Sequence, residues 1–318
     1  MDRKEGSAMR RIALVCVSVV LAPLTGPPPA AATFPGTNGR IAFESRRGEI
    51  FTIESDGTDI MKLTDTARRA NYHPAWSPDG SRIAFVRKGG YFDGPSKLVV
   101  MDADGANATT ILRSPIGDGN NVFYNPAWSP DGSQIVFPAT TTRDQFTHVK
   151  IFVVNDDGTD LASLGAHGGI PDWSPDGAKI VFSTFGSPPR RVGLAVMDAD
   201  GSNQEVLVDR GENYSPKWSP DGSTIVFQRR LHDERRTDIW MVNAGGTGLA
   251  RLTDTPRRWD WRPVYSPDGT QIAFGRGQGP NFFDRENIWL MQADGSMQTQ
   301  VTDTQRRSEA DYSWQPVP

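Results

Sequence analysis

Four histidines are the side chains of this 318-residue sequence best suited to acid–base chemistry or to metal binding. They are His73, His148, His167 and His232, and we expect all four in connections that share one face of the fold. Their positions show no short ligand spacing of a zinc site, so the sequence predicts ordinary loop residues, no metal site and no cofactor. No nucleophile elbow, zinc-protease helix or phosphate-binding loop occurs either, and no catalytic residue is assigned.

The carboxylates give two further possibilities. Asp260 and Asp311 form the best pair for acid–base work, since both are expected where an inner strand enters the fold's centre. Repeated Asp-x-Asp-Gly segments invite a calcium interpretation, but a calcium site needs about six or more oxygen ligands. Hairpin turn geometry is the better interpretation of these segments.

A binding surface is predicted from a motif that occurs in three loops. Thr-Asp-Thr-x-Arg-Arg occupies residues 64–69, 253–258 and 302–307, close to several aromatic residues. Arginine with tyrosine and tryptophan is typical of binding hot spots, and arginine pairs can grip carboxylates or phosphates. The alternative is that these arginines only pair with aspartates of the same loops, Asp65, Asp254 and Asp303. The predicted ligand-binding residues are Arg68, Arg69, Tyr72, His73, Arg257, Arg258, Trp259, Trp261, Phe282, Phe283, Arg306 and Arg307.

The elements that must position these residues repeat along the chain. Ser-Pro-Asp-Gly occurs at residues 77–80, 129–132, 174–177, 219–222 and 266–269, each time after an aromatic residue. An Ile-Ala-Phe or Ile-Val-Phe triplet follows each copy, and a sixth triplet stands at residues 41–43. A third apolar segment and a short fourth one complete each repeat, as in residues 98–101 and 251–253. Proline, aspartate and glycine suit tight turns, and the β-branched and aromatic segments between them predict strands.

Repeats of four strands predict an all-β fold, a six-bladed β-propeller of four-stranded blades. The first repeat lacks its innermost strand, and residues 311–316 supply one at the end of the chain. The C-terminal strand is therefore expected to close the ring and to protect the edges of the array. The predicted propeller spans residues 33–318, and no segment shows sustained helical periodicity.

Residues 1–32 are interpreted as a secretory signal peptide. Arg10 and Arg11 precede an apolar stretch at residues 12–22, and three alanines at 30–32 give a cleavage site. An uncleaved anchor is the alternative, although the stretch is shorter than the ~20 residues of a membrane helix. The only cysteine, Cys16, lies in this segment, so the mature chain is expected to have no disulfide and no transmembrane segment. A formal net charge of −4 gives no indication of nucleic-acid binding.

The repeat Trp-Ser-Pro-Asp-Gly, then Ile-Ala-Phe, then Val-Met-Asp-Ala-Asp-Gly resembles that of the TolB-like, WD40-like (PD40) β-propeller family over residues 34–318. The resemblance implies an exported propeller, periplasmic or in the cell envelope. The α/β domain that precedes the TolB propeller is not expected here, nor are that domain's partners. Propeller-type oligogalacturonate lyases leave a polysaccharide lyase or hydrolase with a divalent metal in the channel as the alternative. The sequence favours a monomeric binding or scaffold module for an extracytoplasmic protein segment or an anionic envelope glycan.

Overall fold

Strands are the only regular elements in the part of the chain that the structure describes. The computed structural model describes residues 36–66, 69–89, 95–116, 123–140, 149–185, 192–231, 234, 236–278, 286–303 and 309–317. The all-β prediction is thereby confirmed for these residues. None of them belongs to a helix long and apolar enough to cross a membrane. The predicted signal peptide, residues 1–32, lies outside the described residues.

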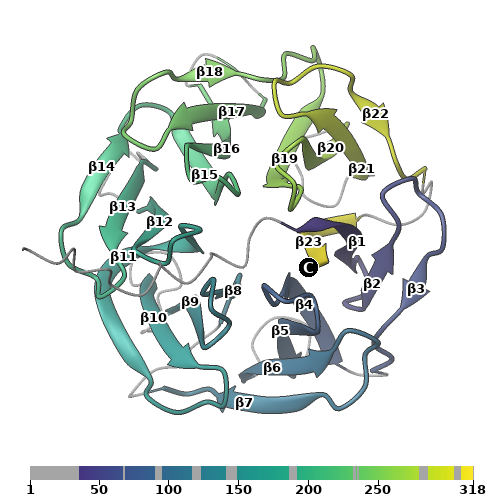
Figure 1. Cartoon of the computed structure of the whole chain (residues 1–318), viewed down its shortest axis with the longest axis vertical. Helices are drawn as coiled ribbons and strands as arrows, with labels where there is room; N and C mark the ends of the chain where they lie inside the picture. Colours follow the sequence, from purple (N-terminus) through teal and green to yellow (C-terminus); the bar gives the residue numbers. More distant parts are fainter. Residues whose placement is uncertain are drawn as a thin grey trace, which may run out of the picture. The chain divides into compact units, whose positions relative to one another are not determined.

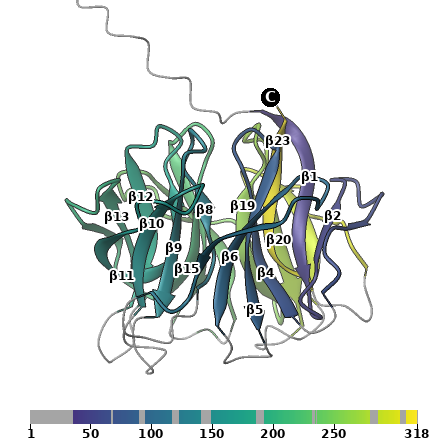
Figure 2. The ribbon, with the colours of Figure 1, turned by 90° about the horizontal axis from the view of Figure 1, so that it is seen from below.

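The described strands form antiparallel sheets that surround a common axis (Figure 1). Seen from the side, the strands run roughly along this axis (Figure 2). One sheet contains, in order, β23 (Glu309–Val317), β1 (Thr37–Ser45), β2 (Ile50–Ile53) and β3 (Met61–Lys62). The next contains β4 (Arg69–Trp76), β5 (Arg82–Gly89), β6 (Ser96–Asp102) and β7 (Thr109–Arg113). A third four-stranded sheet contains β15 (Glu212–Trp218), β16 (Thr224–Arg230), β17 (Asp238–Asn243) and β18 (Ala250–Arg251). A fourth contains β19 (Trp259–Tyr265), β20 (Gln271–Gly277), β21 (Asn287–Gln292) and β22 (Thr299–Gln300).

The remaining strands form one seven-stranded sheet because a long strand belongs to two repeats. Its members are β8 (Ala127–Trp128), β9 (Gln134–Thr140), β10 (Val149–Asn155), β11 (Ala162–Trp173), β12 (Lys179–Thr184), β13 (Leu194–Asp198) and β14 (Glu205–Val208). The first half of β11 pairs with β10, from Ala162 to His167, and the second half pairs with β12, from Gly168 to Trp173. The outer strand of one repeat thus continues directly into the inner strand of the next.

The Ser-Pro-Asp-Gly segments are hairpin turns, as the sequence predicts. In the first copy, Gly80 N–H donates to the carbonyl of Ser77 over 2.9 Å, and Gly80 has a φ of 67° that favours glycine. The Asp79 carboxylate accepts from the Ser77 hydroxyl (2.6 Å) and from the Ser81 N–H (3.1 Å). The carboxylate of each later copy accepts from the same two turn positions. These aspartates therefore hold turns together.

The hydrophobic core is divided among clusters that each join neighbouring repeats. The triplet residues and the aromatic residues before Ser-Pro-Asp-Gly fill these clusters. Trp76, for example, packs with Ala42 and Ile50 of the preceding sheet and with Ile83 and Phe85 of its own. The tryptophans are thus packing residues between repeats, as the sequence indicates.

The two ends of the described chain lie side by side. β1 pairs with β23 from Thr37↔Val317 to Ser45↔Glu309. Trp314 of β23 packs in a cluster with Ile41 of β1 and Ile288 of β21, and its indole N–H donates to the Gly39 carbonyl over 3.0 Å. Segments almost 280 residues apart in sequence therefore share one sheet and one core.

Removing residues 309–318 is predicted to abolish cooperative unfolding, because a whole ladder and the Trp314 cluster are lost together. Trp314→Ala alone should lower the free energy of unfolding by about 3–5 kcal/mol. Val206→Ala in β14, where the side chain is 57% exposed, is the control and should change it by less than about 0.5 kcal/mol. Chemical denaturation followed by tryptophan fluorescence measures all three. A truncated chain with full stability would show that the β1–β23 pairing is dispensable.

Candidate functional site

Six residues near the axis share one level of the fold and one unusual backbone conformation. All six have a positive φ of 25–56°, and all six line a cavity of about 70 Å³. Each lies three residues before an aromatic residue, and in five of the six cases this aromatic residue precedes a Ser-Pro-Asp-Gly turn. We call them the first ring: His73, Asn125, Ile170, Ser215, Arg262 and Asp311.

Local sequence explains why the first ring turns toward the axis. Five of its six members precede a proline, which cannot donate to a strand ladder and is tolerated at bulges. The ladders shift register at this point, for example between Tyr72 and Ala75 of β4 and between Trp261 and Val264 of β19. A bulge re-aims the side chain of the strand that carries it. The left-handed conformation costs about 1–3 kcal/mol for a non-glycine residue, so the packing of neighbouring repeats must hold it.

The backbone of two ring residues is held by a side chain from the preceding sheet. His73 N–H donates to the Glu44 carboxylate over 2.8 Å, and Arg262 N–H donates to the Gln228 amide oxygen over 3.1 Å. Glu44 and Gln228 each follow the phenylalanine of a triplet, in β1 and β16. One position in the second strand of a repeat therefore braces the bulge of the next repeat.

Ionisable groups gather on one side of the first ring. Asp311 accepts from both neighbours: its Oδ2 lies 2.7 Å from His73 Nδ1 and its Oδ1 lies 2.9 Å from Arg262 Nε. Arg262 Nη1 also lies 3.5 Å from Glu286 Oε2, and the Tyr312 hydroxyl donates to Glu286 Oε1 over 2.6 Å. We call Arg262, Asp311 and His73 the charged arc of the ring.

Burial and nearby charges shift the pKa values of the acids in this cluster in different directions. Burial, with the nearby charge of Asp311, raises the pKa of Glu44 to about 7 against the pull of His73 and Arg262. Burial also raises the pKa of Glu286 to about 7, opposed by Arg262. Although burial acts on Asp311 too, the charges of Arg262 and His73 hold the pKa of its carboxyl well below the usual range. Asp311 is therefore the carboxyl group of this cluster that most readily stays ionised, and both His73 and Arg262 contact it.

An ammonium group and two tyrosine rings lie beside His73. Lys88 Nζ of β5 lies 4.7 Å from the ring centroid of Tyr124 and 5.4 Å from that of Tyr72. Both tyrosine rings have centroids within 6.2 Å of the His73 ring. Burial lowers the pKa of the Lys88 ammonium, and the negative charge of Glu44 opposes this shift. A cation stacked on two aromatic faces gives this side of the site both charge and apolar surface.

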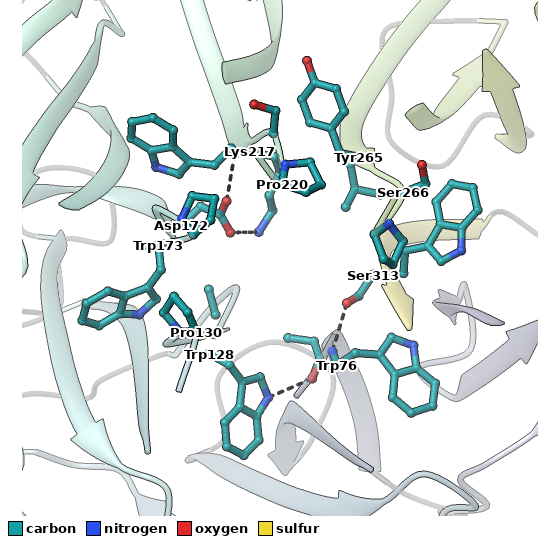
Figure 3. Close-up of a pocket in the computed structure, with 18 of the residues that line it drawn as sticks. Trp76, Trp128, Pro130, Asp172, Trp173, Lys217, Pro220, Tyr265, Ser266 and Ser313 are labelled. Carbon is teal, nitrogen blue, oxygen red and sulfur yellow. Dashed lines mark hydrogen bonds and ion pairs between the residues drawn. The ribbon is translucent and has the colours of Figure 1, made fainter. Parts of the chain in front are cut away.

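A second cavity of about 110 Å³ lies next to the first, toward the Ser-Pro-Asp-Gly turns (Figure 3). Its walls include the residues two positions after the first ring, among them Asp172, Lys217 and Ser313. Lys217 Nζ lies 2.8 Å from Asp172 Oδ1, and Lys217 lines both cavities. Figure 3 shows this ion pair facing Ser313 across the opening. The ion pair of this second level therefore belongs to β11 and β15, on the other side of the axis from the charged arc of β19, β23 and β4.

The structure places only part of the predicted binding surface. His73 lines the first cavity and the Tyr72 ring lies beside it, whereas Arg257 and Arg258 are exposed in the turn before β19. The rings of Trp259 and Trp261 stack with centroids 6.1 Å apart, and Trp261 is only 2% exposed. Arg69 begins β4, and nothing is described of its side chain. Arg68, Phe282, Phe283, Arg306 and Arg307 lie outside the described residues.

Two sequence expectations about individual side chains are wrong. Asp260 and Asp311 do not form a carboxylate pair, because Asp260 lies directly opposite Arg276 in the ladder and accepts from its Nε and Nη2 over 2.7 and 2.8 Å. His73 and His167 do not lie in connections but in β4 and β11, and His167 is exposed. His148 and His232 lie outside the described residues.

Two aspartates of the Thr-Asp-Thr-x-Arg-Arg loops form ion pairs with basic residues outside that motif. Asp254 pairs with Arg236 over 2.5 Å rather than with Arg257 or Arg258, and Asp65 pairs with Lys62 over 2.7 Å. Arg257 and Arg258 therefore remain available at the surface.

Sequence reasoning missed Glu44, Lys88, Arg262 and Glu286. For Arg262 a signal exists, namely the X-Pro pair three residues before the aromatic in five repeats. The other three belong to second-strand positions or to the start of a third strand, where no repeating residue type marks them.

Glu286 is predicted to make folding stability depend on pH. Its carboxyl has a pKa near 7 in the folded protein and near 4.5 in a free chain, so the folded state binds more protons between these values. The free energy of unfolding should thus fall by up to roughly 3 kcal/mol as the pH rises from 4.5 to 7.5. The groups that face Glu286 are Arg262, Tyr312, Asp311 and Glu44.

Glu286→Gln should flatten this profile while keeping the acceptor for the Tyr312 hydroxyl. Thermal unfolding at a series of pH values measures the slope for both proteins. A Glu286→Gln variant with the same pH slope as the wild type would contradict the prediction.

Comparison with known proteins identifies the repeat. The sequence profile of the TolB β-propeller domain matches residues 33–210 and residues 169–317. The Tol-Pal system protein TolB of Albidiferax ferrireducens is 35% identical over 89 residues, 26% of this chain and 19% of that protein. An uncharacterised protein of Agrobacterium fabrum is 32% identical over 117 residues, 35% of either protein. These matches span little more than a third of the curated relatives' length at most.

Solved structures agree with this identification at the level of the fold. The crystal structure of TolB from Acinetobacter baumannii superimposes with a TM-score of 0.72 and 20% identity, covering 89% of this chain and 68% of that one. The two profile matches together cover nearly the whole chain after residue 32. The protein therefore belongs to the TolB β-propeller family.

Proposed function

We propose that this protein is an exported binding module whose channel receives an acidic, extended segment of another extracytoplasmic protein. In this proposal six four-stranded blades form a ring that β23 closes by completing the first blade. The half-and-half pairing of β11 supports a count of six, since it divides the seven-stranded sheet into two repeats. The cluster of Trp314 with Ile41 and Ile288 supports closure, since it joins the first repeat to the last. The leader-like residues 1–32 support export.

The first ring is the observation that carries the binding proposal. Packing alone gives no reason to aim histidine, asparagine, arginine and aspartate at a cavity, nor to hold them in a costly left-handed conformation. Residues with a strained backbone are found preferentially at ligand sites, where the surrounding fold stabilises side chains that are already in position for binding. A channel lined in this way suits recognition of a partner that enters along the axis.

Cations at and above the first cavity favour an acidic partner. Arg262 lines the cavity, Lys88 lies on the tyrosine rings beside His73, and the exposed Arg257 and Arg258 stand in the turn that leads into β19. Charge-assisted hydrogen bonds from such groups to carboxylates are stronger than neutral ones. The twelve residues predicted from the sequence extend this surface onto the loops, and an anionic envelope glycan is the competing ligand.

Binding of acidic peptides is predicted to depend on these cations. We expect a fluorescent Asp- and Glu-rich peptide library to be captured, and the matched Asn- and Gln-rich library not to be. Lys88→Gln, and Arg257→Ser with Arg258→Ser, should each weaken capture about tenfold or more, since one charge-assisted contact contributes about 1.5–3 kcal/mol. Arg113→Ser on the exposed outer strand β7 is the charge-matched control.

Fluorescence anisotropy at two salt concentrations measures these affinities, and higher salt should weaken them. A glycan array run in parallel tests the competing ligand. Equal capture by the wild type and by both channel-side variants would rule out this site. If the protein bound anionic glycans and no acidic peptide, its ligand would be a glycan.

Acid–base chemistry is the second candidate function, and one observation favours it. His73 is oriented by Asp311, with a nearby Glu44 whose pKa near 7 suits a general acid or base. A lyase or hydrolase acting on an anionic polysaccharide would use such a pair. Incubation with polygalacturonate, followed by ultraviolet absorbance of unsaturated products and by reducing-end release, tests this. Activity lost in His73→Asn and kept in His167→Asn would establish it, and no turnover by the wild type would exclude it for this substrate.

A further inference from the structure

We propose that Glu44, His73 and Asp311 form a binding site for one divalent first-row transition-metal ion, with Zn²⁺ and Mn²⁺ as the best-suited ions. The three residues come from β1, β4 and β23, so two sheets create the site together. This site goes beyond the binding function proposed above, since a metal ion could serve recognition or chemistry.

The three side chains already have the spacing of a metal centre. One ligand atom from each lies within 4.8 Å of the others. His73 Nδ1 lies 2.7 Å from Asp311 Oδ2 and 3.9 Å from Glu44 Oε2. Around an ion with bonds of about 2.1 Å, neighbouring ligand atoms lie about 3.0–3.4 Å apart. Opening the His73–Asp311 pair by about 0.3 Å and closing the His73–Glu44 pair by about 0.5 Å would give both pairs this spacing.

The two carboxylate ligands suit a dication. Metal binding requires deprotonated ligands, so Glu44 and Asp311 would each give up a proton or remain ionised when the ion binds. Both side chains are at most 12% exposed, and together they would neutralise an ion of charge +2.

Surrounding hydrogen bonds would orient the ligands. Arg262 Nε donates to Asp311 Oδ1, which leaves Oδ2 to face His73. The backbone N–H of His73 donates to the Glu44 carboxylate. Hydrogen-bonded ligating carboxylates are the usual outer support of metal centres. Arg262 is in this respect a positioning residue.

The donor set also limits the choice of ion and leaves room for more ligands. One imidazole nitrogen with two carboxylates suits zinc, manganese or iron, whereas calcium and magnesium prefer oxygen alone. The Asn125 amide lies 3.3 Å from His73 Nδ1 and could turn its oxygen toward the ion. Because His73 and Asp311 line the 70 Å³ cavity, further positions on the ion would face the channel.

Equilibrium dialysis of the chelator-stripped full chain against ZnCl₂ or MnCl₂, with elemental analysis, tests the proposal. We expect one ion per chain, and a metal-dependent rise in melting temperature. His73→Asn tolerates the left-handed conformation, and Glu44→Gln retains an acceptor for the His73 N–H. Each should lower the affinity at least about tenfold, as losing even an outer partner of a metal ligand does.

His167→Asn removes an exposed histidine and is the matched control, with unchanged binding expected. Circular dichroism shows whether each variant folds. If a variant does not fold, manganese electron paramagnetic resonance of the wild type still reports directly whether the ion is bound. The proposal is overturned if the wild type binds no stoichiometric ion. It is equally overturned if both folded variants bind as the wild type does, or if Ca²⁺ or Mg²⁺ competes at equal concentration.

Discussion

The innermost strand of each repeat can present a side chain to the axis only by leaving the regular pleat at one residue. In a regular strand, alternate side chains point to opposite sheet faces, and here both faces pack against neighbouring repeats. The bulge breaks that alternation and turns His73, Arg262 and Asp311 inward. The cavities and the ionic cluster all depend on this departure.

Contacts from neighbouring sheets hold this strained backbone. Ile170 is β-branched and strongly disfavours a φ of 53°, yet it is held there. Glu44 and Gln228 of the preceding sheets accept the N–H groups of His73 and Arg262. The tryptophan three residues later locks the strand into the next cluster. A channel-lining residue is thus stabilised by two repeats, and a single repeat could not hold it.

The repeat made the all-β fold and its strand boundaries predictable. Turn chemistry is local, so Ser-Pro-Asp-Gly and the triplets place the hairpins directly. The site depends on residues that differ from one repeat to the next, and a repeat consensus does not show these differences. Asp260 shows the limit: its facing residue, Arg276, depends on ladder register, which residue types alone do not reveal. Glu286 shows another limit, since its partners are Arg262 of β19 and Tyr312 of β23, and only the packing of these two strands brings them together.

The distribution of charge along the channel finally constrains what can enter it. At the level of the first ring, the ionisable groups belong to β19, β23 and β4, and Ile170 and Ser215 lie beyond them. Two residues further along the strands, the Asp172–Lys217 ion pair belongs to β11 and β15, whereas β4, β19 and β23 contribute the uncharged Ala75, Val264 and Ser313. The charged wall therefore changes sides between the two levels. An extended chain presents successive side chains in opposite directions, so its neighbouring residues can meet the two charged walls in turn. A flat or compact ligand would contact one charged wall and leave the other facing uncharged side chains.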